Sequence, residues 1–149
     1  MKITIPSAEE MENFGMALGR LCPETFSIYL EGDLGAGKTT LARGILRACG
    51  FQGKVKSPTY TLVESYSTAA GEIFHFDLYR LESAEELANI GFRDYFAESS
   101  LLLLEWPEKA KAILPPADLV IVFQIEPSGR ILQLISASPK AEELVQQLQ

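Results

Sequence analysis

Short apolar runs alternate along the chain with segments that suit helices, which is the pattern of strands interleaved with helices. Ser7-Ala8-Glu9-Glu10 matches a capping box, so we expect a helix that begins there and ends near Leu21. Ser83-Ala84-Glu85-Glu86 is a second capping box, and Gly91 can end the short helix that it opens. The same pattern predicts helices at Thr39–Cys49, Glu108–Leu114 and Lys140–Leu148, and strands at Lys2–Ile5, Thr25–Glu31, Tyr60–Tyr66, Glu72–Tyr79, Ser100–Glu105, Asp118–Ile125 and Arg130–Ala137.

The order of these elements favours a three-layer α/β sandwich with a mostly parallel central sheet. Ser100–Glu105 is a dense apolar run, the kind of strand that is buried on both faces. Ser67–Gly71 is a hairpin-sized turn and a second hairpin-like pair flanks Pro127–Gly129, so some strands should be antiparallel. The chain has 149 residues with no repeat, linker or low-complexity tract, and we expect a single domain over residues 1–149.

Composition and charge narrow the range of functions. No apolar run approaches the roughly 20 residues of a membrane span, and the N-terminus lacks the apolar segment of a signal peptide. Cys22 and Cys49 have no metal-ligand spacing, so we expect reduced thiols and a cytoplasmic protein without membrane contact. The net charge is −7, whereas a protein that holds nucleic acid by itself normally has a basic surface. We therefore expect no binding to DNA and no independent binding to RNA.

The motif with the clearest chemistry is Gly32–Thr39, which reads G-D-L-G-A-G-K-T and is a complete phosphate-binding loop. It follows the apolar run Phe26–Leu30 and leads into the helix-compatible stretch Leu41–Cys49. A triphosphate needs many N–H donors aimed at one point, and a glycine-rich turn at a helix N-terminus supplies them. Lys38 can reach the β- and γ-phosphates, and the Thr39 hydroxyl can ligate Mg²⁺. The loop therefore predicts a nucleoside triphosphate site.

A phosphate-binding loop also needs a metal-holding carboxylate at the carboxyl end of a neighbouring strand. Glu105 follows Leu101–Leu104 and matches the usual signature of four apolar residues and then an acid. Asp77 follows Ile73–Phe76, a run that His75 interrupts. We assign Glu105 to Mg²⁺, directly or through water. We expect Asp77 to support the metal site without binding the metal itself, or to orient the attacking water. Either carboxylate could instead cap a loop.

Hydrolysis further requires a group that senses the γ-phosphate. Ser57-Pro58-Thr59 lies where a switch loop would, and the Thr59 hydroxyl could contact Mg²⁺ or the γ-phosphate. Without further information, a plain Ser-Pro turn is the simpler interpretation. Taken alone, Trp106 suits packing, His75 suits the core, and Arg130 suits the surface of a late turn.

Four motifs occur together, in one order and spacing. They are Gly32-Asp33-Leu34-Gly35-Ala36-Gly37-Lys38-Thr39-Thr40, Ser57-Pro58-Thr59-Tyr60-Thr61-Leu62-Val63, His75-Phe76-Asp77-Leu78-Tyr79-Arg80-Leu81 and Glu105-Trp106-Pro107. Together they resemble the TsaE family, formerly YjeE, the small bacterial ATPases of tRNA threonylcarbamoyladenosine biosynthesis. The resemblance runs from the first helix through the Gly129-Arg130 turn, and no motif position departs from the family pattern.

The resemblance implies a P-loop α/β sandwich that binds ATP or ADP with Mg²⁺ and hydrolyses ATP slowly. It implies two partner proteins, TsaD and TsaB, which transfer a threonylcarbamoyl group to N6 of adenosine 37 in tRNAs that read A-starting codons. On this basis the chain would be an accessory ATPase, and it would meet tRNA only indirectly, through the partner complex. The acidic charge agrees with that role.

The resemblance also implies a set of site residues. Thr39 and Glu105 would hold Mg²⁺, and Arg130 would lie near the nucleotide. Lys38, Thr59, Asp77 and Glu105 would be the catalytic residues. The nucleotide contacts would come from Leu34, Gly35, Ala36, Gly37, Lys38, Thr39, Thr40, Trp106 and Arg130.

Other classes of nucleotide-binding protein share the loop. The main alternative is a small-molecule or nucleoside kinase, although such kinases usually carry several arginines in a lid and the six arginines of this chain do not cluster. A GTPase would need an Asn-Lys-x-Asp stretch, which the sequence lacks. An adaptor that binds nucleotide without hydrolysing it remains open. The preference for ATP over GTP follows from the resemblance alone.

Overall fold

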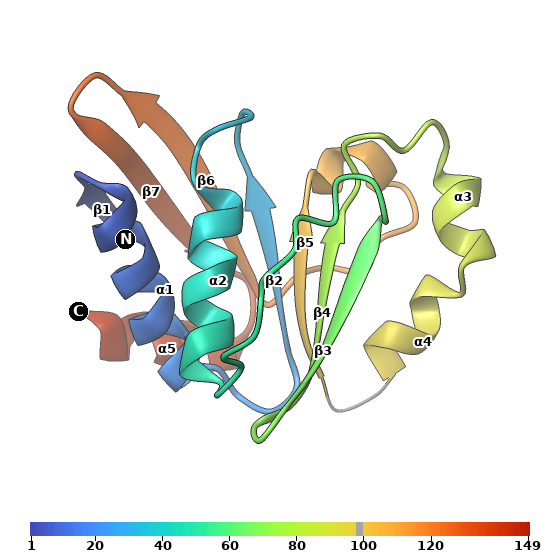
Figure 1. The fold of residues 1–149 in the computed structure, drawn as a ribbon, viewed down its shortest axis with the longest axis horizontal. Coiled ribbons are helices and arrows are strands. Elements are labelled where there is room, and N and C mark those ends of the chain that lie inside the picture. Colours follow the sequence, from blue (N-terminus) through green and yellow to red (C-terminus); the bar gives the residue numbers. More distant parts are fainter. Residues whose placement is uncertain (98–99) are drawn as a thin grey trace.

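A seven-stranded sheet runs through the middle of the molecule in the order β1-β7-β6-β2-β5-β4-β3 (Figure 1). The computed structural model describes residues 1–97 and 100–149. The sequence pattern predicted seven strands, and the described residues contain seven. Their bounds are β1 Lys2–Ile5, β2 Phe26–Glu31, β3 Val63–Thr68, β4 Gly71–Asp77, β5 Ser100–Glu105, β6 Leu119–Glu126 and β7 Gly129–Ser136.

The four central strands, β6, β2, β5 and β4, are parallel to their neighbours. At one side β7 pairs antiparallel with β6, and β1 pairs antiparallel with β7. At the other side β3 pairs antiparallel with β4 through a tight hairpin. The prediction of a mostly parallel centre with some antiparallel strands is confirmed.

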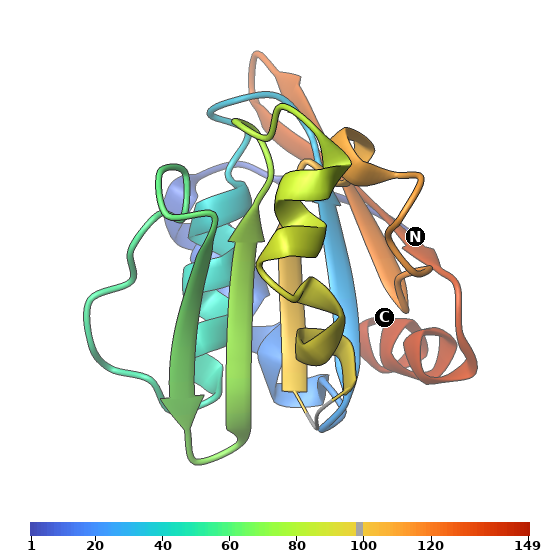
Figure 2. The same ribbon diagram turned by 90° about the vertical axis from the view of Figure 1, so that its right-hand side faces the viewer.

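Helices cover both faces of the sheet and complete three layers. One apolar cluster joins the sheet to α1, α2 and α5, and a second joins the opposite face to α3, α4 and the short 3₁₀ helix η1. Figure 2 looks onto α3 and α4, with the strands behind them. The bounds are α1 Ala8–Leu21, α2 Lys38–Ala48, α3 Ala84–Asn89, α4 Phe92–Ala97, η1 Pro107–Ala110 and α5 Pro139–Leu148.

The central strand β5 is buried along its whole length, as its apolar run predicted. Leu101 and Leu103 pack into the cluster under α1 and α2, whereas Leu102 and Leu104 pack into the cluster under α3 and α4. Successive side chains of a strand point to opposite faces. Glu105 therefore follows Leu103 onto the face that α2 covers.

Helix α1 packs closely against α2 because both helices carry glycine at the contact. A Cβ atom on Gly44 would overlap the carbonyl oxygen of Glu12, and a Cβ atom on Gly15 would overlap the carbonyl oxygen of Leu41. The Ser7 capping box is confirmed, because the Ser7 hydroxyl accepts the N–H of Glu10 at 3.1 Å. Helix α1 is thus fixed at its start and held tightly against the helix that follows the phosphate-binding loop.

Several predicted boundaries were wrong. The strand predicted from Tyr60 begins at Val63, because Pro58–Thr61 form a turn in which the N–H of Leu62 bonds to the Pro58 carbonyl at 2.9 Å. The second capping box does not form, since the Ser83 hydroxyl makes no capping bond and the Glu86 carboxylate accepts the N–H of Glu82 instead.

Two short helical segments also differ from the prediction. The helix expected at Glu108–Leu114 is reduced to η1, which begins at Pro107 and gives way to a turn. Helix α4 was not predicted, because its six residues are too few to show a helical period. Within the described ranges, none of the helices combines the length and the apolar character that crossing a bilayer requires.

Candidate functional site

The predicted phosphate-binding loop connects β2 to α2. Gly37 immediately precedes the helix with φ 105°, a left-handed conformation that favours glycine, and no side chain caps the helix. A Cβ atom on Gly37 would also press on the Met11 side chain. Because the first N–H groups of a helix have no intrahelical partner, those at the start of α2 remain available to an anion.

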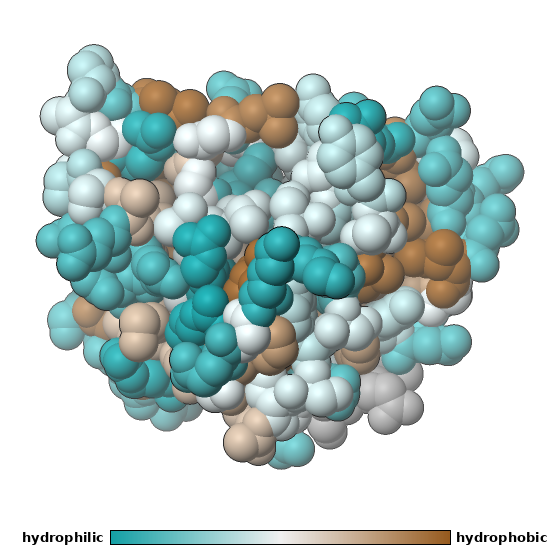
Figure 3. Space-filling model, in the orientation of Figure 1, coloured by the Kyte–Doolittle hydropathy of each residue, from teal (hydrophilic) through white to brown (hydrophobic). Residues whose placement is uncertain are grey.

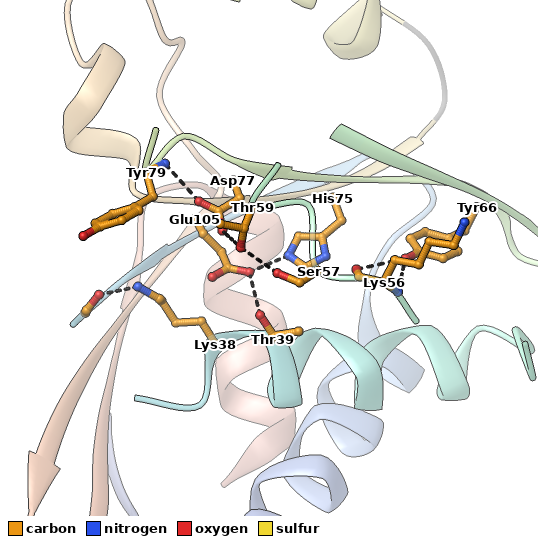
Figure 4. A network of polar contacts seen from close by, with 11 residues as sticks. Lys38, Thr39, Lys56, Ser57, Thr59, Tyr66, His75, Asp77, Tyr79 and Glu105 are labelled. Atoms are coloured by element: carbon orange, nitrogen blue, oxygen red, sulfur yellow. Dashed lines mark hydrogen bonds and ion pairs between the residues drawn. The ribbon is translucent and has the colours of Figure 1, made fainter. Parts of the chain in front are cut away.

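The loop borders a hollow of about 230 Å³. Of the twelve residues that sequence reasoning put in the site, the hollow brings together all except Arg130. Figure 4 shows five of them, Lys38, Thr39, Thr59, Asp77 and Glu105, gathered between α2 and the strand ends. Its lining comes from the loop, the turn before β3 and the ends of β4 and β5. The lining residues are Leu34, Gly35, Ala36, Gly37, Lys38, Thr39, Thr40, Thr59, Asp77, Glu105 and Trp106.

The two candidate carboxylates lie at the ends of adjacent parallel strands. Asp77 is the register partner of Glu105, and both side chains are buried. Glu105 faces α2, where the Thr39 hydroxyl donates to its Oε2 atom at 3.2 Å. The contact between Thr39 and Glu105 joins the two residues that were expected to hold the metal.

Asp77 is surrounded by a separate set of donors. The Thr59 hydroxyl donates to Oδ2 at 3.2 Å, and the backbone N–H of Tyr79 donates to Oδ1 at 2.9 Å. Burial raises the pKa of Asp77 above its usual value, and the charge of Glu105 acts in the same direction, while the Tyr79 N–H opposes the shift. Asp77 is therefore easier to protonate than an exposed aspartate.

Lys38 is held by the protein itself. Its ammonium group donates to the carbonyl oxygen of Gly32 and lies 3.9 Å from the centre of the Trp106 ring. Burial lowers the pKa of Lys38, and the charges of Glu105 and Asp77 counter that effect. A cation between an aromatic face and one carbonyl can exchange that carbonyl for a phosphate oxygen.

Trp106 is fixed by its backbone as well as by its ring. It adopts a left-handed conformation with φ 62° and ψ 51°, and its N–H bonds to the Leu30 carbonyl at 3.3 Å. The Tyr79 ring lies 4.9 Å from the Trp106 ring, centre to centre. A strained backbone conformation of this kind persists only where its surroundings hold it, and such residues cluster at functional sites.

A second hollow, of about 290 Å³, lies on the other side of the loop. It contains Arg130, whose guanidinium donates to the Gly35 carbonyl at 3.2 Å. Sequence reasoning missed this hollow and its contribution from the start of the chain. Its lining is Ile5, Pro6, Ser7, Ala8, Met11, Gly35, Ala36, Gly37, Thr40, Gly129 and Arg130.

His75 also contributes to the site, although the sequence analysis interpreted it as a core residue. Its Nε2 atom lies 2.6 Å from Glu105 Oε2, and the imidazole is fully buried. The signal available in the sequence was its strand parity with Asp77, which puts both side chains on one face. That signal could not show that the partner would be Glu105.

The chemistry of these groups suits a magnesium nucleotide. A hydroxyl and a carboxylate are the hard oxygen ligands that Mg²⁺ prefers, and Mg²⁺ usually takes one or two protein ligands beside phosphate and water. In the described part of the chain, no cluster of three or more histidine, cysteine, aspartate or glutamate side chains offers a complete protein cage for a metal. Thr39 and Glu105 therefore fit a metal that is bound together with phosphate.

Comparisons with known proteins identify the family. The model of the family described as threonylcarbamoyl adenosine biosynthesis protein TsaE matches residues 5–132. The tRNA threonylcarbamoyladenosine biosynthesis protein TsaE of Haemophilus influenzae is 44% identical over 146 residues, which cover 95% of this chain and 92% of that protein. The protein of the same name from Rickettsia felis is 32% identical over 148 residues, covering 99% and 86%.

A solved structure is similar over nearly the whole chain. The crystal structure of YdiB from Bacillus subtilis matches with a TM-score of 0.85 and 26% identity, covering 99% of this chain and 93% of that one. This similarity confirms the α/β fold. With a family model over most of the chain and relatives above 30% identity, the chain belongs to the TsaE family.

Proposed function

We propose that this protein is a magnesium-dependent ATPase of tRNA threonylcarbamoyladenosine biosynthesis, and that it supports the TsaD–TsaB complex. The pathway is the one named for its relatives. One observation carries the proposed chemistry: the Lys38 ammonium, the Thr39 hydroxyl and the carboxylates of Asp77 and Glu105 line one hollow at the uncapped start of α2. This set of groups suits phosphoryl transfer, which depends on positioning and charge stabilisation.

Lys38 and the loop backbone would bind the phosphates. Lys38 would exchange its bond to the Gly32 carbonyl for a phosphate oxygen while its ammonium stays near the Trp106 ring. Thr39 and Glu105 would hold Mg²⁺, which when bound neutralises charge on the phosphoryl oxygens. The existing bond from Thr39 to Glu105 keeps the hydroxyl and the carboxylate close enough to share one metal.

Asp77 and Thr59 would act on the side of the attacking water. The raised pKa of Asp77 makes its carboxylate a better proton acceptor than an ordinary aspartate. Thr59 donates to Asp77 from the turn before β3, so a γ-phosphate that drew the hydroxyl away would change the position of that turn. In this way the turn would sense the terminal phosphate.

The nucleoside part would lie in the second hollow. The two hollows share Gly35, Ala36, Gly37 and Thr40, so a ligand with phosphates in the first can extend into the second. Met11 offers an apolar surface there, and Arg130 offers a cation beside it. We assign Arg130 to the nucleoside or the α-phosphate on this basis.

The experiment that tests the proposal is tRNA modification in vitro. Purified TsaD and TsaB with threonylcarbamoyl-adenylate would be given this protein with ATP, with ADP, or omitted. We expect more than one modification per partner complex only when this protein and ATP are both present. The Glu105→Ala variant should remove that effect, whereas the matched control Glu85→Ala, at an exposed position in α3, should retain it.

Three other outcomes would contradict parts of the proposal. If modification proceeds equally without this protein, the assignment to the TsaD–TsaB reaction is wrong. If the protein stimulates modification equally with ADP, the requirement for hydrolysis is wrong. A phosphorylated small molecule or nucleoside formed from ATP would favour the kinase alternative.

A further inference from the structure

His75 is a buried histidine with one bonded and one unbonded ring nitrogen. Its Nε2 atom lies 2.6 Å from Oε2 of Glu105, and its side chain is 0% exposed (Figure 4). Among the buried side-chain atoms of the described residues, His75 Nδ1 is the one nitrogen or oxygen that has no hydrogen-bond partner. A histidine kept only for packing would be expected to satisfy both nitrogens or to be replaced by an apolar residue.

The surroundings decide which atom holds the proton in this contact. Oε2 of Glu105 also accepts the Thr39 hydroxyl, and an ionised carboxylate only accepts hydrogen bonds. A neutral imidazole beside such a carboxylate donates through Nε2–H, which leaves a lone pair on Nδ1. A protonated carboxyl would reverse the roles and put an N–H on Nδ1, where no acceptor lies. A buried N–H without an acceptor is less tolerated than a buried lone pair.

We propose that His75 is a positioning residue for Glu105, and that its Nε2–H holds the carboxylate in the orientation that binds a divalent cation. This inference rests on the proposed function. Glu105 lines the hollow together with Thr39 and Lys38, so an orientation fixed by His75 would present its carboxylate to a cation bound there. The ligand class is a divalent cation bound together with nucleotide phosphates.

His75 matters most when the metal binds. Thr39 and His75 are the two side chains of the described residues that bond to Glu105. If the Thr39 oxygen also held the metal, its hydroxyl would be shared between the metal and Glu105, and the Nε2–H of His75 would be the donor to Oε2 that does not itself bind the metal. Partners of this kind, behind the metal ligands, typically contribute about 10- to 100-fold in metal affinity.

A direct test needs no ligand, because His75 is the single histidine of the chain. Nitrogen NMR of histidine-labelled protein at neutral pH would show the protonation of each ring nitrogen without any assignment problem. We expect a proton on Nε2. A spectrum in which Nε2 carries no proton would overturn the proposal, since His75 could then not donate to Glu105.

A second test uses two amide variants of the same chemistry. The amide nitrogen of His75→Gln can take the place of Nε2, whereas that of His75→Asn stops near the position of Nδ1. ADP binding would be measured by calorimetry with and without Mg²⁺. We expect His75→Asn to reduce the gain in affinity that Mg²⁺ gives by about tenfold or more, His75→Gln to retain most of it, and both to bind ADP normally without Mg²⁺.

Controls separate this inference from the proposed function. Ile73→Val changes a buried residue on the same face of the same strand and should leave the Mg²⁺ effect intact. If His75→Asn keeps the full Mg²⁺ effect while Glu105→Ala loses it, His75 does not position Glu105, and the metal assignment stands. If Glu105→Ala also keeps the full effect, the metal assignment under the proposed function is wrong as well. Equal losses in Ile73→Val and His75→Asn would likewise refute a specific role for His75.

Discussion

Replacing Lys38 with methionine should remove most of the affinity for ADP. Two unit charges 4 Å apart attract each other by about 4 kcal/mol at an effective dielectric constant of about 20, so a terminal phosphate with nearly two charges attracts the ammonium by about 8 kcal/mol. To reach it, Lys38 gives up its bond to the Gly32 carbonyl, about 2 kcal/mol, and part of its contact with Trp106, about 1 kcal/mol. Solvent and salt weaken the remainder. We expect a loss of at least about 3 kcal/mol, or more than a hundredfold in the dissociation constant.

The assay is isothermal titration calorimetry with ADP and without Mg²⁺, so that metal coordination does not contribute. Methionine keeps the apolar stem as far as the ε position and removes the ammonium group. The matched control is Lys109→Met, because Lys109 is exposed in η1 and its ammonium lies 5.8 Å from the Tyr79 ring, outside the hollow. We expect the control to bind ADP as the unmodified protein does. A folded Lys38→Met protein that binds ADP within about threefold of the unmodified protein would refute the electrostatic reasoning.

Three further changes test other parts of the structure. Glu105→Ala should abolish Mg²⁺-dependent release of phosphate from ATP while leaving Mg²⁺-free ADP binding intact; if Asp77→Ala alone gives that pattern in the same two assays, the roles of the carboxylates are reversed. Gly44→Ala should lower the stability by about 2 kcal/mol and the melting temperature by roughly 4–8 °C, since the new Cβ atom overlaps the backbone of α1; an unchanged melting curve would show that the helices can separate freely. The raised pKa of Asp77 means that the folded protein binds its proton more tightly than the unfolded chain, so stability should fall as pH rises from the ordinary value of 3.8 through the raised pKa. In thermal unfolding at several pH values, Asp77→Asn should lack that fall and melt higher at neutral pH, and an identical pH profile would contradict the assignment.

The sequence was sufficient wherever a short pattern determines local geometry. The glycine-rich loop was found from its spacing, and the Ser7 capping box from four residues that bond within one turn. Glu105 was found from the four apolar residues that precede it, which form the buried strand β5. These features depend on residues close together in the chain, so the local sequence is enough to predict them.

Features that depend on distant segments were not predictable in the same way. Leu62 adopts φ 71°, and its carbonyl accepts the N–H of Asp77 at 2.9 Å, a bond to a strand that lies well beyond the turn in the sequence. The second hollow requires the pairing of β1 with β7, which no local sequence pattern predicts. The bond from His75 to Glu105 crosses between two strands whose order in the sheet had to be known first.

The place of β1 in the sheet has a consequence for the synthesis of the protein. β1 reaches the sheet only through β7, which enters between β1 and β6. During synthesis β1 therefore has to wait for Gly129–Ser136 before it can pair, and the loop closure that joins the two strands spans most of the sequence. Until then Ile5 and Met11 have no complete pocket to line, so a nascent chain should complete the hollow beside Gly32–Thr39, the proposed phosphate site, before the second one. A chain stalled just before β7 is thus expected to hold phosphate groups without a complete pocket for the rest of the nucleotide.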